Sequence, residues 1–243
     1  MQWAGIAPGR VLAQAAAMLG KMLPAQHCLL CQGHSGDTLL CPPCREELPP
    51  LPENHCPVCA LPTPSGETCG QCLAAPPHYD RTIARWVYGF PVDRLIQALK
   101  YGHQLAVGQF LGDALLTGPS PDLSAGNTVL LPVPLSSGHL RQRGFNQAVE
   151  IARPIGRALQ LPMVLDSCRR TRETAAQTSL PWKARQKNIR HAFECSIDLS
   201  GKDVILIDDV MTTGATLNEL ARTVKKHGAL TVTNWVCARA LKP

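Results

Sequence analysis

The stretch that decides the fold reads Val204-Ile-Leu-Ile-Asp208-Asp209-Val210-Met211-Thr212-Thr213-Gly214-Ala215-Thr216. Its apolar start has the length and character of a buried parallel strand. A helical pattern follows from Ala215 to about His227 and ends at Gly228. A buried strand followed by a short loop and a helix predicts an α/β fold, in which helices flank a parallel sheet.

The loop between this strand and this helix has the composition of a phosphate-binding loop. We expect the backbone amides of residues 212–216 and the helix dipole to face an anion, with the threonine hydroxyls as further donors and Gly214 allowing close approach. Asp208 and Asp209 would repel a phosphate unless they face another group, and the vicinal hydroxyls of a ribose are natural donors to them. The stretch therefore predicts a ribose 5-phosphate site.

Two common nucleotide-binding motifs are absent from this stretch. A Walker A loop needs Gly-Lys before its Ser or Thr, and a dinucleotide fingerprint needs three spaced glycines with an acidic residue much later. Residues 204–216 match neither pattern. The structural alternative is that Asp208 and Asp209 merely cap the end of a strand.

A second pattern lies nearer the N-terminus and consists of four CxxC pairs. Two residues between cysteines let both thiolates bind one tetrahedral ion, and two such pairs complete a four-cysteine zinc site. The two halves of the pattern have the same internal spacing, which favours sequential over crossed pairing. The predicted ligands are Cys28, Cys31, Cys41 and Cys44 for one ion, and Cys56, Cys59, Cys69 and Cys72 for the other.

We expect both zinc sites to be structural. Each is closed by four protein ligands, and the segment has few large apolar side chains, so metal binding would supply much of its folding free energy. A disulfide framework and a thioredoxin-like redox pair are the alternatives. We expect no secretion signal in front of the cysteines and find no βαβ context around them, which disfavours both alternatives. Cys168, Cys195 and Cys237 are expected to be ordinary reduced residues.

The composition of the 243 residues, 45% hydrophobic and 17% charged, fits a globular protein and excludes a fibre, a membrane bundle and a disordered tail. No apolar run approaches the roughly 18 residues of a transmembrane helix. Residues 1–80 carry three basic against six acidic residues, whereas residues 81–243 carry 21 against 12. We expect three parts: an amphipathic helix over residues 1–27, a double zinc ribbon over residues 28–78 and an α/β domain over residues 79–243.

Most of the positive charge lies in residues 141–190, which hold 11 basic against three acidic residues. An anionic partner is expected there. Arg141 and Arg143 could neutralise a pyrophosphate, the whole segment could contact nucleic-acid phosphates, or the segment could be a solvated basic face. Aromatic residues are sparse in it, so base stacking is weakly supported.

Together these motifs resemble the ComF (ComFC) family, and residues 204–216 resemble the PRPP-binding motif of type I phosphoribosyltransferases. The resemblance spans about residues 28–240. The further motifs that carry it are Leu99-Lys100-Tyr101-Gly102, Leu131-Pro132-Val133-Pro134-Leu135, Arg141-Gln142-Arg143-Gly144-Phe145-Asn146-Gln147 and Arg185-Gln186-Lys187-Asn188-Ile189. It implies a type I phosphoribosyltransferase-like parallel sheet flanked by helices, behind a small zinc-ribbon module.

The resemblance also implies roles for residues of this chain. Asp208 and Asp209 would hold the ribose hydroxyls of PRPP, residues 212–216 its 5′-phosphate, and Mg²⁺ would bind mainly through pyrophosphate and ribose oxygens. A pyrophosphate loop is expected at residues 132–135, and a flexible strand pair over residues 169–179 would bring Arg170, Arg172 and Gln177 to the substrate. The residues expected to contact pyrophosphate or nucleic acid are Lys100, Pro134, Leu135, Arg141, Arg143, Arg170 and Arg172.

Three functional hypotheses follow. In the first, a cytoplasmic, non-transmembrane ComF-family protein binds PRPP or a related ribose phosphate, contacts single-stranded DNA, and serves DNA uptake or the use of extracellular DNA with uptake machinery at the inner membrane. In the second, it is an active phosphoribosyltransferase that transfers the 5-phosphoribosyl group of PRPP to an unidentified acceptor; the sequence identifies no catalytic base. The third, a PRPP-sensing regulator, ranks last because no helix-turn-helix pattern is present.

Overall fold

The computed structural model describes residues 26–123, 126–171 and 189–241. The chain divides into two compact units, Met1–Glu47 and Leu48–Pro243. In the smaller unit, strands β1 (Gln26–His27) and β2 (His34–Gly36) pair antiparallel, and helix α2 (Pro42–Glu46) follows. The predicted N-terminal helix spans residues 1–27. Of these, residues 1–25 lie outside the described part of the chain, and residues 26 and 27 form β1.

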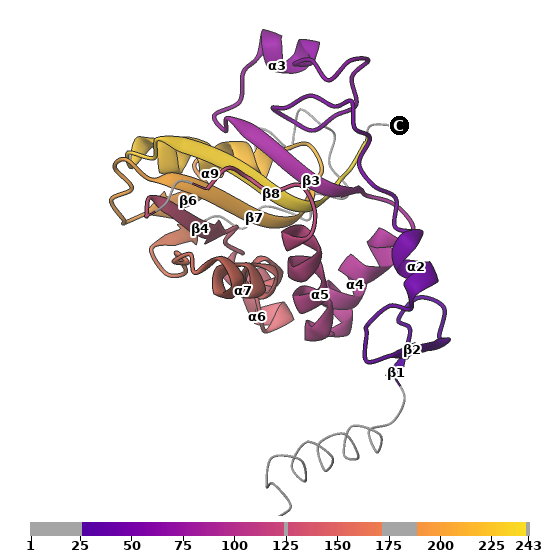
Figure 1. The fold of residues 1–243 in the computed structure, drawn as a ribbon. Helices are drawn as coiled ribbons and strands as arrows, with labels where there is room; N and C mark the ends of the chain where they lie inside the picture. The colour runs from indigo at the N-terminus through magenta and orange to yellow at the C-terminus, as the bar shows by residue number, and fades with distance from the viewer. Residues whose placement is uncertain (1–25, 124–125, 172–188, 242–243) are drawn as a thin grey trace, which may run out of the picture. The chain divides into compact units, whose positions relative to one another are not determined.

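The larger unit is built on a four-stranded parallel sheet (Figure 1). The strand order is β3 (Arg81–Val87), β8 (Thr231–Arg239), β7 (Asp203–Met211) and β4 (Thr128–Pro132). A parallel sheet covered on both faces needs apolar side chains on both sides of its strands. Leu206, Ile207 and Trp235 accordingly are fully buried in the two central strands. The predicted α/β class is confirmed.

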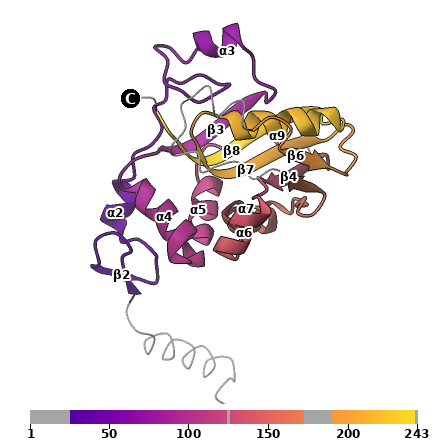
Figure 2. The same cartoon turned by 180° about the vertical axis from the view of Figure 1, so that it is seen from behind.

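Helices cover both faces of this sheet (Figures 1 and 2). Helices α5 (Leu105–Leu116) and α7 (Gln147–Leu159) lie on one face, and α4 (Val92–Gly102) packs on α5. Helix α9 (Ala215–Lys226) lies on the other face. None of the helices in the described ranges is both long and apolar enough to cross a membrane.

Arg141 and Arg143 lie in a short helix, α6 (Ser137–Arg143), which precedes α7. Ser136 caps this helix, and Gly144 ends it with a φ of 77°. The side chain of Asn146 then caps α7 by accepting from the Ala148 N–H at 3.0 Å. Each of these two consecutive helices therefore has its own N-terminal cap.

Strand β7 is longer than its apolar start indicates. It continues through both aspartates because β8 pairs with it as far as Met211, which lies opposite Arg239. Asp208 and Asp209 therefore lie within the strand, and only residues 212–214 separate it from α9. The extra pairing holds the carboxylates on rigid backbone.

The second cysteine group is part of the larger unit. Cys56, Cys59 and Cys72 are buried in the same apolar cluster as Tyr79 and Met211, and a short helix, α3 (Gly70–Ala74), carries the last of the three. The predicted domain boundary near residue 78 stays a prediction from motifs. In the folded chain, this ribbon and the sheet share one core.

Arg239 links this ribbon to the phosphate loop. Its side chain is buried, and its Nε donates to the Cys59 carbonyl at 2.7 Å. Its Nη1 donates to the Met211 carbonyl at 2.9 Å and also to that of Thr212. One guanidinium therefore holds a zinc-ribbon knuckle and the start of the loop together.

A two-stranded antiparallel ribbon lies beside the sheet. It consists of β5 (Cys168–Arg170) and β6 (Phe193–Cys195), with Cys168 opposite Cys195. The two cysteines form a disulfide. The prediction that both are reduced is wrong, because directly opposed positions bring two side chains within bonding reach. Cys237 is a free, buried cysteine of β8, as predicted.

Candidate functional site

A cavity of about 670 Å³ lies at the carboxyl ends of β4 and β7. Open α/β sheets bind ligands at this edge because loops and helix N-termini converge there. The lining residues come from α4, the segment after β4, α6, the start of α7, β5 and the turn from β7 into α9. They are Tyr88, Ile96, Gln97, Lys100, Tyr101, Val133, Pro134, Leu135, His139, Arg143, Gln147, Arg170 and residues 208–217.

The phosphate loop forms the turn at one wall of the cavity. Gly214 has a φ of 77° and precedes α9, whose N-terminus carries the positive end of the helix dipole. The Thr213 hydroxyl accepts from the Ala215 N–H at 3.2 Å, which fixes the turn. A Cβ at Gly214 would lie 2.6 Å from Met211 Cε and 3.1 Å from Tyr79 Oη. Both its conformation and its packing therefore require glycine.

Asp209 is the most enclosed charge of the site. It is 2% exposed, forms an ion pair with Lys100 through Oδ2, and accepts from Gln147 Nε2 at 3.2 Å through Oδ1. Arg143 Nη1 in turn donates to Gln147 Oε1. Helices α4, α6 and α7 thus each contribute one polar side chain to a network that ends on the carboxylate.

The two adjacent aspartates titrate in opposite directions. Burial and the charge of Asp209 raise the pKa of Asp208 well above its usual value. Burial also acts to raise the pKa of Asp209, but Lys100 outweighs it and lowers that pKa overall. For Lys100, burial lowers the pKa and Asp209 raises it, with a net rise. The site therefore holds one ion pair and one carboxyl group that resists ionisation.

Most of the predicted anion-site residues meet in this cavity. Residues 208–216 line it, as do Lys100, Pro134, Leu135, Arg143 and Arg170. Arg141 is exposed on α6 and is absent from the lining. Arg172 and Gln177 lie outside the described residues.

Several lining residues were missed as site residues in the sequence. Gln97 lies three residues before Lys100 and four before Tyr101, and this helical spacing is the signal that could have found them. His139 lies three residues after the cap Ser136, and its Nδ1 is 2.8 Å from the Ser136 hydroxyl. Gln147 carried no signal of its own, because its partner Asp209 is 62 positions away in the chain.

The two cysteine groups have the geometry of closed metal sites. Within each group, all four Sγ atoms lie within 4.8 Å of one another, and the grouping is the sequential one. A tetrahedral zinc site with Zn–S bonds of about 2.3 Å has S···S distances of about 3.8 Å. The structure has 3.7 Å between the Sγ atoms of Cys31 and Cys41, and 3.6 Å between those of Cys59 and Cys69. The donor sets fit structural zinc.

In each cysteine group, hydrogen bonds from the backbone lower the pKa of one thiol. Burial acts to raise the pKa of Cys28, but hydrogen bonds from the backbone of Cys31 and Cys41 lower it to about 6. Burial likewise acts to raise that of Cys56, while backbone donors, including the Cys69 N–H at 3.3 Å from Sγ, lower it to about 7. Such donors favour the ionised form that a metal requires.

Comparisons with known proteins identify both the cysteine region and the region of the phosphate loop. A double zinc ribbon domain model matches residues 18–73, and a phosphoribosyl transferase domain model matches residues 142–240. DNA utilization protein YhgH of Shigella flexneri is 34% identical over 194 residues, which cover 76% of this chain and 84% of that protein. Competence protein F of Haemophilus influenzae is 30% identical and covers 88% of this chain and 96% of its own. Competence protein ComFC of Bacillus subtilis is 28% identical, with coverages of 84% and 85%.

Among solved structures, a purine phosphoribosyltransferase from Pyrococcus horikoshii Ot3 is 18% identical, with a TM-score of 0.28. It covers 66% of this chain and 89% of its own, a likeness too low to support an argument. The sequence relatives, by contrast, extend over both the cysteine region and the sheet unit.

Proposed function

Because the chain belongs to the ComF family of competence proteins, which joins a double zinc ribbon to a phosphoribosyltransferase-like domain, we propose that its cavity binds PRPP or a related ribose 5-phosphate during the handling of incoming DNA. One observation carries the proposal. The carboxylates of Asp208 and Asp209 lie in the same cavity as the N-terminus of α9. A ribose 5-phosphate has hydroxyls that can donate to the two aspartates and a phosphate that can bind at the helix N-terminus.

The polar groups of the cavity suit the parts of PRPP. The N–H groups of residues 212–216 would hold the 5′-phosphate, and the two aspartates the ribose hydroxyls. Lys100, Arg143 and Arg170 line the cavity and would neutralise the pyrophosphate, beside the backbone of Pro134 and Leu135. Mg²⁺, bound with PRPP, would supply further positive charge at the pyrophosphate oxygens.

Phosphoribosyl transfer is the second candidate, and His139 favours it. This histidine lines the cavity, and its ring is oriented by Ser136. In such a transfer the bond from C1 of ribose to pyrophosphate breaks, a bond from C1 to the acceptor forms, and the acceptor loses a proton. An imidazole at the cavity wall is a suitable proton acceptor. Release of pyrophosphate from PRPP in the presence of candidate bases, lost in His139→Gln, would support this activity.

Single-stranded DNA contact is supported by aromatic and basic side chains that include Tyr101 and Arg143 of the cavity lining and their neighbours in the chain. Tyr101 is 70% exposed, and the guanidinium of Arg143 lies 5.6 Å from its ring centre. His103 and Phe145 meet edge to face at 5.9 Å, and Arg141 is exposed on α6, four residues before Phe145. Bases stack on exposed aromatic rings while arginines contact phosphates. The fold therefore gathers aromatic side chains that are far apart in the sequence. Our proposal locates this contact at the cytoplasmic face of the inner membrane, with uptake machinery as partner.

Calorimetric titration with ribose 5-phosphate, and with PRPP and Mg²⁺, tests the ligand. We expect saturable binding by the wild type and at least a roughly tenfold loss of affinity in Gly214→Ala, because the new Cβ would displace the loop. Gly201→Ala is the matched control, since Gly201 also has a positive φ, of 72°, but open space around a Cβ. Wild-type protein that binds neither ligand at millimolar concentration would contradict the proposal.

DNA binding is tested by isotherms at several salt concentrations with an oligothymidine strand. Arg141→Ala/Arg143→Ala should weaken binding and reduce the slope of log K against log salt by about 1.4, for two lost phosphate contacts at about 0.7 each. Tyr101→Ala should lose about 1–3 kcal/mol of stacking, and Tyr101→Phe should retain it.

Lys202→Ala/Lys226→Ala is the charge-matched control for these isotherms. Lys202 precedes β7, so it lies at the opposite end of the nine-residue strand from the cavity. An equal loss of affinity in this control and in the arginine double variant would show that binding depends only on net charge. That result would contradict the proposed DNA-binding surface.

A further inference from the structure

The ribbon of β5 and β6 joins a disulfide to an arginine of the cavity. In its register Cys168 lies opposite Cys195, and Arg170 lies opposite Phe193. Residues two apart in a strand share a face, so Cys168 and Arg170 lie on the same side of β5. A single residue separates the disulfide from the side chain that lines the anion site.

Arg170 depends on the position of β5. Its guanidinium lies 6.0 Å from the ring centre of Phe193 and lines the cavity together with Asp208. Burial lowers its pKa, and the charge of Asp208 opposes that effect, so the two side chains interact electrostatically. A backbone bridge also joins Arg170 to Ser136, the cap of α6. A shift of β5 would therefore move the Arg170 guanidinium in the cavity and disturb the backbone bridge to Ser136.

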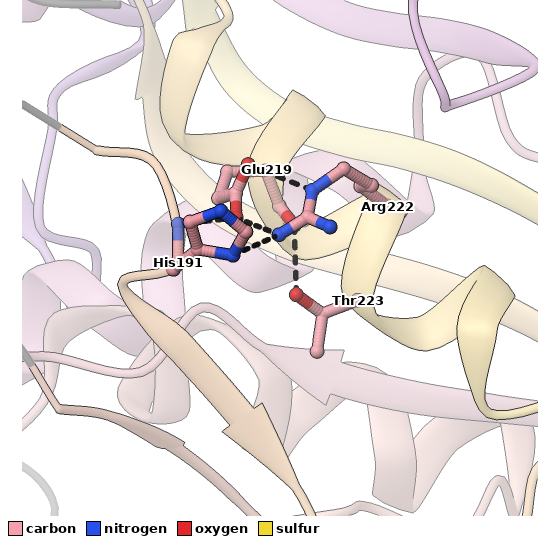
Figure 3. Close-up of polar contacts among 4 residues, drawn as sticks. All are labelled: His191, Glu219, Arg222 and Thr223. Carbon is pink, nitrogen blue, oxygen red and sulfur yellow. Dashed lines mark hydrogen bonds and ion pairs between the residues drawn. The ribbon is translucent and has the colours of Figure 1, made fainter. Parts of the chain in front are cut away.

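The other side of the ribbon is anchored to α9 (Figure 3). His191, two residues before β6, donates its backbone N–H to Glu219 Oε1 at 2.7 Å. Arg222 Nη2 lies 3.2 Å from His191 Nδ1, and Arg222 also forms an ion pair with Glu219. Burial acts to raise the pKa of Glu219, but Arg222 and the His191 N–H lower it overall, which keeps the anchor charged.

Within the described residues, β6 continues from the His191 anchor on α9, and β5 is bridged to Ser136 through Arg170. Beyond the ladder itself, β5 and β6 are joined by hydrogen bonds from Thr171 N to the Ala192 carbonyl, at 2.8 Å, and from Ser196 N and Oγ to the Ser167 carbonyl, at 2.7 Å and 3.4 Å. A pair of three-residue strands is marginally stable by itself. The covalent bond therefore restrains β5 against the anchored β6.

We propose that Cys168 and Cys195 form a reversible thiol–disulfide switch: the oxidised pair holds Arg170 in the anion cavity, and reduction releases β5 and weakens ribose-phosphate binding. This inference rests on the proposed ribose-phosphate site. It adds a redox modification site, the Cys168–Cys195 pair, which lies outside the cavity and changes the affinity of the cavity for its ligand.

The switching step is exchange with a thiol reductant of the dithiol or glutathione class. A reductant thiolate attacks Sγ of Cys195, the half-buried member, whereas Cys168 is 2% exposed. The S–S bond breaks, and Cys168 leaves as a thiolate that takes up a proton. A second reductant thiolate then attacks the reductant sulfur of the mixed disulfide and releases Cys195. Two electrons pass to the protein, and the reductant leaves as a disulfide.

Full-length, zinc-loaded protein in oxidised and in reduced glutathione buffer, both with added zinc, tests the switch. In the oxidised buffer, non-reducing peptide mass spectrometry should find Cys168 linked to Cys195. In the reduced buffer, affinity for ribose 5-phosphate should fall about three- to tenfold, because Arg170 is no longer preorganised. Amide hydrogen exchange should rise at residues 168–171 and much less at residues 193–195.

Two variants separate this switch from other redox effects. Cys168→Ala/Cys195→Ala should have the weaker affinity in both buffers, and Cys237→Ala should keep the wild-type response. Equal affinity and equal exchange in both buffers, or a redox response that persists in the double variant, would overturn the inference. If ribose 5-phosphate binds in neither buffer, the proposed ligand is wrong, and hydrogen exchange at β5 still decides whether the switch exists.

Discussion

Cys56→Ala is expected to lower the free energy of unfolding of the sheet unit by at least about 4 kcal/mol, because it removes a structural zinc whose ribbon shares the core of that unit. Cys56, Cys59 and Cys72 are buried in the cluster that contains Tyr79 and Met211. Loss of the metal would leave the two buried thiols of Cys59 and Cys72 and the half-buried thiol of Cys69 without the ion that they bind together. Urea unfolding followed by tryptophan fluorescence, to which the buried Trp86 and Trp235 of the sheet contribute, measures the effect.

Cys28→Ala is the matched comparison for this variant. It also removes one ligand from a four-cysteine group, but that group belongs to the compact unit Met1–Glu47. We expect each variant to retain about one zinc per chain in place of two. Cys28→Ala should leave both the tryptophan-fluorescence transition and the affinity for ribose 5-phosphate unchanged. Equal destabilisation of the sheet by the two variants would contradict the conclusion that only the second cysteine group stabilises the sheet unit.

Asp208→Asn and Asp209→Asn should both abolish ribose-phosphate affinity, by about a hundredfold or more, yet change stability in opposite directions. Each substitution replaces a carboxyl oxygen, which would accept from a ribose hydroxyl, by an amide NH2 group, which can only donate. Asp208→Asn also removes a carboxyl group that burial and Asp209 make costly to ionise, so the variant should be more stable than the wild type by about 1–2 kcal/mol at pH 8. Asp209→Asn leaves Lys100 without its partner and should lose about 2–3 kcal/mol.

The pH dependence gives this pair of variants a second measurement. In the unfolded chain Asp208 titrates near about 3.9. Its folded pKa is raised, so its contribution to stability is greatest below that value and is lost as pH rises through the folded pKa. The advantage of Asp208→Asn over the wild type should therefore grow between pH 5 and pH 8. For Asp209, whose pKa is lowered, the stabilising effect is present above the unfolded value and is lost as pH falls through the folded one.

Urea titrations of both variants at the two pH values check these expectations. The same sign of stability change for the two substitutions, or an Asp208→Asn advantage that shrinks with rising pH, would contradict the assignment of the ion pair to Lys100 and Asp209. Ribose 5-phosphate titrations of the same preparations separate the loss of binding from any loss of folding.

The local features of the fold could be predicted from the sequence because they depend on local periodicity. The strand starting at Val204 and the helix starting at Ala215 follow from apolar runs, small loop residues and a terminal glycine. The metal groups follow from the spacing of cysteines. The end of β7 did not follow, since pairing with β8, 28 positions away at Met211 and Arg239, extended the strand through two charged residues.

Long-range contacts account for what was missed in the candidate site. Lys100 was expected near pyrophosphate, but only the packing of α4 places it against Asp209. The disulfide required the register of β5 on β6, for which strands of three residues give no periodic signal. The contacts of Tyr101 with Arg143 and of His103 with Phe145 likewise join the end of α4 to residues 143–145, so their separation in the sequence concealed them.

The buried guanidinium of Arg239 has a thermodynamic consequence for the two ligands of the sheet unit. It donates to the carbonyls of Cys59 in the zinc ribbon and of Met211 and Thr212 at the phosphate loop. We expect zinc at the ribbon and the proposed anion at the loop each to favour the conformation in which these carbonyls converge. By reciprocity, the factor by which zinc increases the affinity for the anion would equal the factor by which the anion increases the affinity for zinc. Under this expectation, the ribbon would act as an effector of the site as well as a scaffold.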